Sequence, residues 1–193
     1  MTVPHLPWHT CRVALTSTMH RFHVELSDVD RGVYESLDLR VAQHPSESVR
    51  RMLARVLAYL LAYEEGIDFG RGLSDPGEPA VAVKDLTGRL RAFIDVGFPS
   101  PERLHRASKT GARVAVYVYA EKPLKSWLAD LAKATIHQRA ALEIWLLPGE
   151  LLDDLESRVE RTVRWNVTVS DGRLYIECGD HTAEGTPERR VLD

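Results

Sequence analysis

The sequence has little cysteine and no long apolar run. Its two cysteines, Cys11 and Cys178, do not stand at metal-site spacing, and cysteine this sparse is typical of a reducing compartment. No apolar stretch approaches the roughly 20 residues that a bilayer-spanning helix needs. The first residues also lack the charged-then-apolar pattern of a signal peptide. We therefore expect a cytoplasmic protein with no membrane partner.

A strong charge of one sign is also missing. The 193 residues contain 25 Lys and Arg against 28 Asp and Glu, a formal net charge of −3. This balance argues against a protein that coats nucleic acid wholesale, although it is compatible with a local basic cleft. The glycines match neither the Walker nor the GxGxxG arrangement. No helix-turn-helix, zinc-finger or aromatic-rich RNA-binding strand is recognisable either, so no base-reading element is predicted.

The composition is that of an ordinary globular chain, 44% hydrophobic and 27% charged. At this length we expect a single domain over 1–193. Its ordered core should run from about 10 to 179. A loose lead-in at 1–9 and a polar, mobile tail at 180–193 should flank that core.

Periodicity and turn signals predict an α/β chain that begins and ends in a β-hairpin. The terminal hairpins are predicted from alternating apolar residues at 11–26 with 33–42, and at 162–170 with 173–177. Between them we expect helices at 46–65, 100–110, 124–134 and 148–160, and strands at 78–84, 89–97, 113–120 and 141–147. The strand–helix–strand order from 89 to 120 indicates a right-handed crossover to a parallel neighbour.

Two carboxylates draw attention to the central hairpin, Gly77 to Pro99. A tight turn over 85–88 joins its strands, and a hairpin symmetric about that turn places Glu78 opposite Asp95 on one face. Directly opposed side chains have Cβ atoms about 4.5–5.5 Å apart. Two acids at that distance need a cation, a shared proton or a basic neighbour.

Asp95 is the more informative acid, because it interrupts a strongly apolar strand. An ionised carboxylate in such a strand is costly unless it is paired or ligates a metal. One interpretation is therefore a metal ligand. The other is a buried structural aspartate that backbone amides or an arginine satisfies.

The helix expected at 46–65 opens with Ser46 as its N-cap and Glu47 in its first turn, where the helix dipole favours an acid. Glu47 is then either a surface acid or part of the carboxylate site. Arg50, Arg51 and Arg55 form a basic edge near the helix start, which we interpret as a solvated face.

The segment after the central hairpin is basic. Five basic or potentially basic side chains lie in residues 100–113: Arg103, His105, Arg106, Lys109 and Arg113. Such a cluster favours a phosphate-bearing ligand but does not distinguish binding from cleavage.

Four short motifs occur in one order: His44-Pro45-Ser46-Glu47, Arg71-Gly72-Leu73, Glu78-Pro79 and Asp95-Val96-Gly97-Phe98-Pro99. Together they resemble the YaeQ family of small bacterial proteins, and the likeness runs from about residue 11 to residue 178. YaeQ-like proteins are placed in the PD-(D/E)XK, or restriction-endonuclease-like, superfamily. The resemblance implies a restriction-endonuclease-like mixed β-sheet flanked by helices, with the active site on a central hairpin. The terminal hairpins would be additions to that core.

The resemblance also implies a chemistry. Glu78 and Asp95 would hold Mg²⁺ or Mn²⁺, with Glu47 as an additional acid, and the metal would activate a water for phosphodiester hydrolysis. The lysine expected two residues after Asp95 is Gly97. Arg106 or Lys109 on the following helix would take over its role. Arg106 could only stabilise the phosphate charge, because an arginine does not give up its proton.

The function implied by this resemblance is a Mg²⁺-dependent nuclease acting on DNA or RNA. Two alternatives stay open. One is a nucleic-acid-binding or regulatory protein on a catalytically inactive nuclease fold, and the other is a protein-interaction module whose acids shape the core. The sequence predicts no oligomeric state.

Overall fold

The computed structural model describes residues 17–71 and 77–192. The expected lead-in at 1–9 and the start of the first predicted strand lie outside these residues. The described strands are β1 (Thr18–Asp28), β2 (Val33–Gln43), β3 (Ile67–Phe69), β4 (Val81–Lys84), β5 (Leu90–Val96), β6 (Arg113–Val118), β7 (Glu143–Leu146), β8 (Thr162–Ser170), β9 (Arg173–Cys178), β10 (His181–Gly185) and β11 (Glu188–Arg190). The described α-helices are α1 (Val49–Leu61), α2 (Pro101–Ser108), α3 (Leu124–Lys133) and α4 (Gly149–Arg158).

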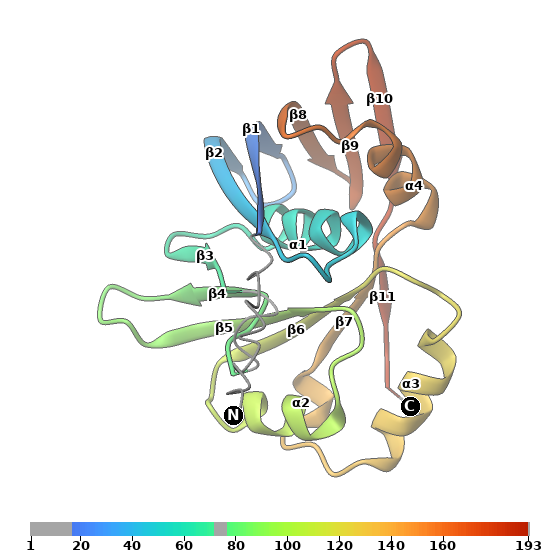
Figure 1. Cartoon of the computed structure of the whole chain (residues 1–193). Helices are drawn as coiled ribbons and strands as arrows, with labels where there is room; N and C mark the ends of the chain where they lie inside the picture. Colours follow the sequence, from blue (N-terminus) through green and yellow to red (C-terminus); the bar gives the residue numbers. More distant parts are fainter. Residues whose placement is uncertain (1–16, 72–76, 193) are drawn as a thin grey trace, which may run out of the picture.

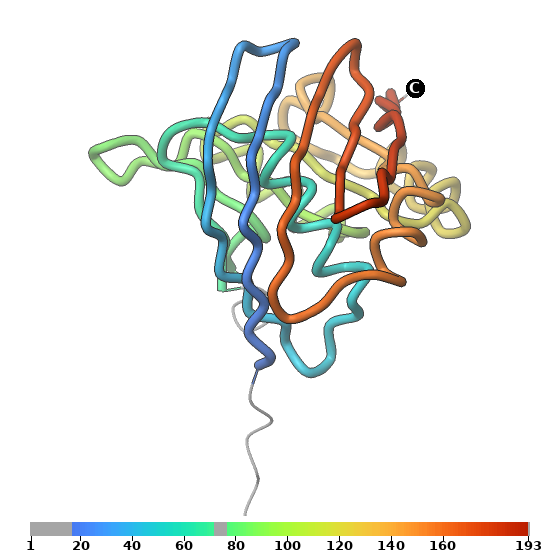
Figure 2. The backbone as a smooth tube through the Cα atoms, turned by 90° about the horizontal axis from the view of Figure 1, so that it is seen from above, coloured from blue at the N-terminus to red at the C-terminus, as the bar shows by residue number. Residues whose placement is uncertain are grey.

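The strands form two mixed sheets rather than one. A five-stranded sheet has the order β10-β9-β8-β1-β2, and a six-stranded sheet has the order β11-β7-β6-β5-β4-β3 (Figure 1). Both predicted terminal hairpins, β1–β2 and β8–β9, are confirmed. Their association was not predicted: β1 pairs in parallel with β8, so hairpins from opposite ends of the chain lie side by side (Figure 2).

Helix α1 lies between the two sheets and is buried on all sides. Nine consecutive residues from Met52 to Leu60 are buried, and they join one hydrophobic core with the inner faces of both sheets. A helix that is apolar around most of its circumference is typical of such a central position. The predicted single apolar face therefore understated how deeply this helix is enclosed.

Helices α2 and α3 cover the opposite face of the six-stranded sheet, where they form a second core with β6 and β7 (Figure 1). The Ser100 side chain caps α2, and Pro101 stands at its first turn, as predicted. The predicted parallel neighbour is confirmed as well, because β5 and β6, which α2 connects along the chain, pair in parallel. None of the described helices has the length and apolar character to cross a membrane.

The prediction of a mobile tail at 180–193 is wrong. Residues 181–185 form β10 beside β9, and 188–190 form β11 beside β7 in the other sheet. Few residues here are apolar, but alternation along β10 buries Ala183. The free edges of β9 and β7 supply hydrogen-bonding partners that a composition-based reading does not detect. The segment thereby ties the two sheets together.

Candidate functional site

The central hairpin forms, but its register differs from the symmetric one. Val81 pairs with Ile94, and a β-bulge interrupts the pairing closer to the turn. Continuing this register places Ala80, not Glu78, opposite Asp95. The predicted cross-strand carboxylate pair is therefore wrong by two residues.

The length of the turn accounts for one of these two residues of offset. The Asp85 N–H donates to the Arg89 carbonyl (3.0 Å), so the loop spans three residues rather than four. Gly88 closes the loop with φ of +81°, the left-handed conformation that a three-residue hairpin loop requires at one position. The bulge adds the second residue of offset.

Asp95 is buried, with 5% of its surface exposed, and its partner is an arginine. Arg103 of α2 forms an ion pair with the Asp95 carboxylate. The same guanidinium donates to the Glu78 carbonyl (2.7 Å) and lies over the Phe93 ring, 5.3 Å from its centroid. The arginine-satisfied aspartate that the sequence left open as an alternative is the arrangement found.

Glu78 lies at the surface, with 36% of its side chain exposed. Its carboxylate accepts a hydrogen bond from the Arg71 N–H (3.0 Å), and the Arg71 Nε lies 3.7 Å away. Glu78 and Asp95 thus meet through Arg103, which contacts the backbone of one residue and the side chain of the other.

A cleft of about 970 Å³ opens beside β3, β4 and β5. Glu78 lines this cleft, whereas Asp95 does not. Acidic side chains outnumber basic ones in the described lining. The charged residues are Glu64, Glu65, Asp68, Glu78 and Asp85 against Arg71, Lys84 and Arg91.

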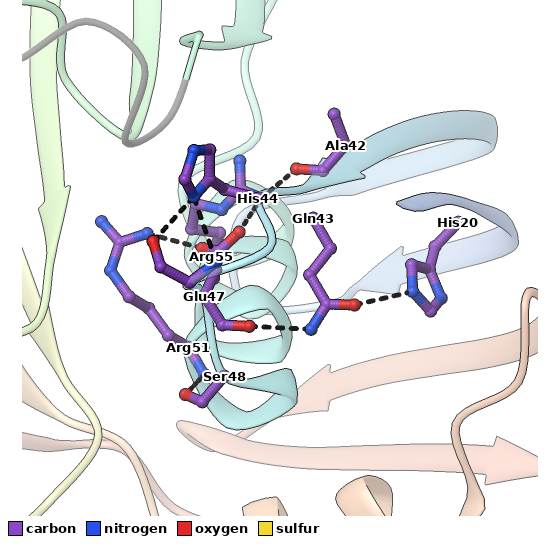
Figure 3. Close-up of polar contacts among 9 residues, drawn as sticks. His20, Ala42, Gln43, His44, Glu47, Ser48, Arg51 and Arg55 are labelled. Carbon is purple, nitrogen blue, oxygen red and sulfur yellow. Dashed lines mark hydrogen bonds and ion pairs between the residues drawn. The ribbon is translucent and has the colours of Figure 1, made fainter. Parts of the chain in front are cut away.

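Glu47 occupies a different and deeply buried cluster. Helix α1 begins two residues later than expected, with Ser48 rather than Ser46 as its N-cap, so Glu47 precedes the helix. Its carboxylate, 1% exposed, accepts hydrogen bonds from Arg51 (2.5 Å) and Arg55 (2.8 Å), as Figure 3 shows. Among the described residues it makes no contact with the hairpin acids.

The interpretation of the α1 arginines as a solvated edge is also wrong. Arg55 is 2% exposed, and burial lowers the pKa of its guanidinium while Glu47 opposes that effect. Arg55 also donates to the Ala42 carbonyl (2.8 Å) and lies 5.9 Å from the centroid of the Phe69 ring. Because Ala42 belongs to β2 and Phe69 to β3, this cluster links the two sheets. We interpret it as a structural crosslink behind the wall of the cleft.

Gly97 has a conformation that a lysine would not readily adopt. Its φ is +95°, and a Cβ added there would lie 3.2 Å from the Tyr119 ring. Left-handed backbone costs an ordinary residue roughly 1–2 kcal/mol. Glycine in place of the expected lysine therefore suits the left-handed backbone conformation at this position.

The predicted replacements for that lysine do not contact the acids. Arg106 on α2 and Lys109 at its C-cap are exposed, and neither contacts Glu78 or Asp95 among the described residues. Sequence reasoning placed Arg103 in the basic cluster but did not identify it as the partner of Asp95. Its place in the first turn of α2, three residues after the capping Ser100, was the available signal. Arg113 is engaged by carboxylates of β7 and of the α1–β3 connection.

These side chains, as arranged, do not fit a magnesium ion. Over the described part of the chain, no group of three or more His, Cys, Asp or Glu side chains could hold a metal. Asp95 and Glu47 each have arginine partners, and only Glu78 faces the cleft. Hard divalent cations need several free oxygen ligands at one point, and each of these arginines competes for them.

The chain is thus a small α/β protein in which two mixed sheets enclose a buried helix. Arginines pair with the acids at its central hairpin. A family model described as "YaeQ protein" matches residues 13–187. The chain therefore belongs to the YaeQ family.

Individual relatives agree with this assignment. The Escherichia coli (strain K12) "Uncharacterized protein YaeQ" is 29% identical over 172 residues, covering 89% of this chain and 94% of that protein. The crystal structure of YaeQ protein from Xanthomonas axonopodis pv. citri has 31% identity and a TM-score of 0.84, covering 92% of this chain and all of that one. YaeQ protein from Pseudomonas syringae has 33% identity and a TM-score of 0.82, covering 92% of this chain and 97% of that one.

Proposed function

We propose that this protein binds DNA or RNA through the basic end of α2, on a restriction-endonuclease-like fold that has lost phosphodiester hydrolysis. The observation that carries the proposal is the ion pair between Arg103 and Asp95. In a metal-dependent nuclease the central acid must offer free oxygens to the metal. Here the guanidinium of Arg103, from the basic helix α2, is paired with the carboxylate of that acid, Asp95.

The fold-level part of the proposal rests on three features. The six-stranded sheet is mixed, helices lie on both of its faces, and the central hairpin β4–β5 carries or adjoins both acids. These are the features expected of the restriction-endonuclease-like superfamily. Likeness of fold supports a common scaffold without supporting a common reaction.

The binding surface is a group of exposed cations. Arg106 lies on α2, Lys109 caps its C-terminal end, and Arg91 lies near the start of β5. Arg91 and Thr110, which directly follows Lys109, both line the large cleft, so the end of α2 adjoins the strand. We call Arg91, Arg106 and Lys109 the α2 basic group. Exposed cations gathered in this way neutralise phosphates and release counterions.

Fluorescence anisotropy with labelled single-stranded DNA and RNA of one sequence tests this surface. The triple Ala variant of the α2 basic group is compared with a control that removes three exposed lysines around α3: Lys122, Lys125 and Lys133. Both variants change the net charge equally. We expect the first to weaken binding and to reduce the salt slope, log K against log salt concentration, by about 2–3. The control should bind like the parent.

Equal weakening by the two variants would show that only net charge matters and would overturn the proposed surface. The same samples, with excess Mg²⁺ or Mn²⁺, are examined for cleavage on a denaturing gel. Intact probe is the expected result. Cleavage that Asp95→Asn abolishes would overturn the loss of hydrolysis and establish the metal-dependent nuclease instead.

A further inference from the structure

A second cavity, on the face of the six-stranded sheet opposite α2, has the character of a small-molecule site. It measures about 280 Å³ and lies where the β1–β2 and β8–β9 turns meet the six-stranded sheet. Ligand pockets usually measure about 300–1,000 Å³, so this cavity suits a small ligand. Its lining is mainly apolar, with Leu61, Val169 and Pro187 among its walls.

Two aromatic residues form one wall together. Tyr117 on β6 and Trp145 on β7 are directly opposite each other in the parallel register, so their side chains leave the same sheet face side by side. Tyr117 is 4% exposed. Within the described residues, neither its hydroxyl nor the Trp145 indole N–H has a hydrogen-bond partner. Trp145 is only partly buried, and neither polar atom is itself fully buried, so each is accessible to a ligand or to solvent.

The charged groups at the other wall are already paired. Arg31 donates to Asp28 (2.6 Å) and to the carbonyls of Leu60 and Tyr63 at the end of α1. Asp30 accepts two backbone N–H groups of the β8–β9 turn, each at 2.8 Å. The cavity therefore offers the Tyr117 hydroxyl and the Trp145 N–H as donors, and its described lining holds no unpaired cation that would recognise an anionic ligand.

We propose that this cavity binds a small, neutral heteroaromatic molecule that packs against Tyr117 and Trp145 and accepts a hydrogen bond from the Tyr117 hydroxyl at a ring nitrogen. A flat ring matches the paired aromatic wall, since aromatic groups gain from offset or edge-to-face contact. Burial raises the pKa of Tyr117 to about 12, so its hydroxyl keeps its proton at neutral pH and can donate. This site shares no lining residue with the large cleft and is independent of the proposed function.

Benzimidazole and indole provide a matched pair of probes. They have nearly the same shape, and at mildly alkaline pH both are neutral, but only benzimidazole has a ring nitrogen that accepts a hydrogen bond. Titration of the ¹⁵N-labelled full chain is followed through the tryptophan indole N–H signals, with Trp145→Phe identifying the one from Trp145. We expect benzimidazole to shift that signal saturably at millimolar concentration, and indole to bind at least fivefold more weakly.

Two variants locate the site. Tyr117→Phe removes one donor and should weaken benzimidazole binding about tenfold, the usual effect of losing one hydrogen bond. Thr186→Trp adds bulk to an exposed residue of the lining and should abolish binding without disturbing the core. Tyr175→Phe, on the outer face of the other sheet, should bind like the parent.

The spectrum of each variant reports its own folding. If Tyr117→Phe does not fold, Thr186→Trp still decides the location. A lack of saturable shift, equal binding of indole, or unchanged binding by Thr186→Trp would each overturn the proposal.

Discussion

Replacing Asp95 by Asn should destabilise the protein, because it removes the carboxylate that forms an ion pair with the Arg103 guanidinium. The two side chains are only 6% and 20% exposed. Removing one partner of a buried ion pair costs about 3–5 kcal/mol. Arg103 keeps its bond to the Glu78 carbonyl and its contact with the Phe93 ring, and Asn keeps one acceptor oxygen. We therefore expect a loss at or just below the lower end of that range, about 2–3 kcal/mol in the free energy of unfolding.

Urea unfolding at neutral pH, with chelator and with excess Mg²⁺, measures this loss. At a slope of about 2 kcal/mol per molar urea, the midpoint should fall by about 1–1.5 M. Asp130→Asn on α3 is the matched control: it removes the same charge from an exposed residue and should change stability by less than about 0.5 kcal/mol. Magnesium should not stabilise the parent.

A double-mutant cycle with Arg103→Met isolates the pair itself. We expect Asp95→Asn and Arg103→Met together to cost less than the sum of the two, with a coupling energy of about 1–3 kcal/mol. The reasoning is refuted if Asp95→Asn is as stable as the parent in chelator while Mg²⁺ stabilises only the parent. That result would show that Asp95 binds a metal ion, which stabilises the folded state, rather than pairing with an arginine.

Three further predictions use the same urea assay. Glu47→Gln removes the counter-charge of the buried Arg55 and the partly buried Arg51 and should cost about 3–5 kcal/mol; a loss below 1 kcal/mol would contradict the buried cluster. Gly97→Ala should lower the free energy of unfolding by about 1–3 kcal/mol, because φ is +95° and the new Cβ lies 3.2 Å from the Tyr119 ring. Gly97→Lys should be no more stable than Gly97→Ala and should not cleave the nucleic-acid probe. Burial raises the pKa of Tyr117 from 10.0 to about 12, so its contribution to stability is complete below pH 10 and is lost as the pH rises through 12. That loss should reach about 2–3 kcal/mol and be absent in Tyr117→Phe. Because Tyr59 has a similarly raised pKa, the parent-minus-variant difference is the quantity to compare.

Local signals in the sequence were sufficient for most of the elements. The Ser100-Pro101 pair determined the start of α2, since a capping hydroxyl and a proline at the first position act within one turn. Alternation and turn residues likewise determined both terminal hairpins. The basic character of α2 and the burial of Asp95 also followed from neighbouring residues alone.

Tertiary structure decided what those elements pair with. The parallel pairing of β1 with β8 joins segments about 140 residues apart, and no local pattern encodes it. The hairpin register depended on a three-residue loop and a bulge, each of which shifts every later pair. The partner of Asp95 depended on how α2 packs against β5 after the crossover. A charge in the sequence shows that a partner is needed, but only the packed chain selects which one, because ion pairing acts over a few ångströms and the chain must first bring the groups together.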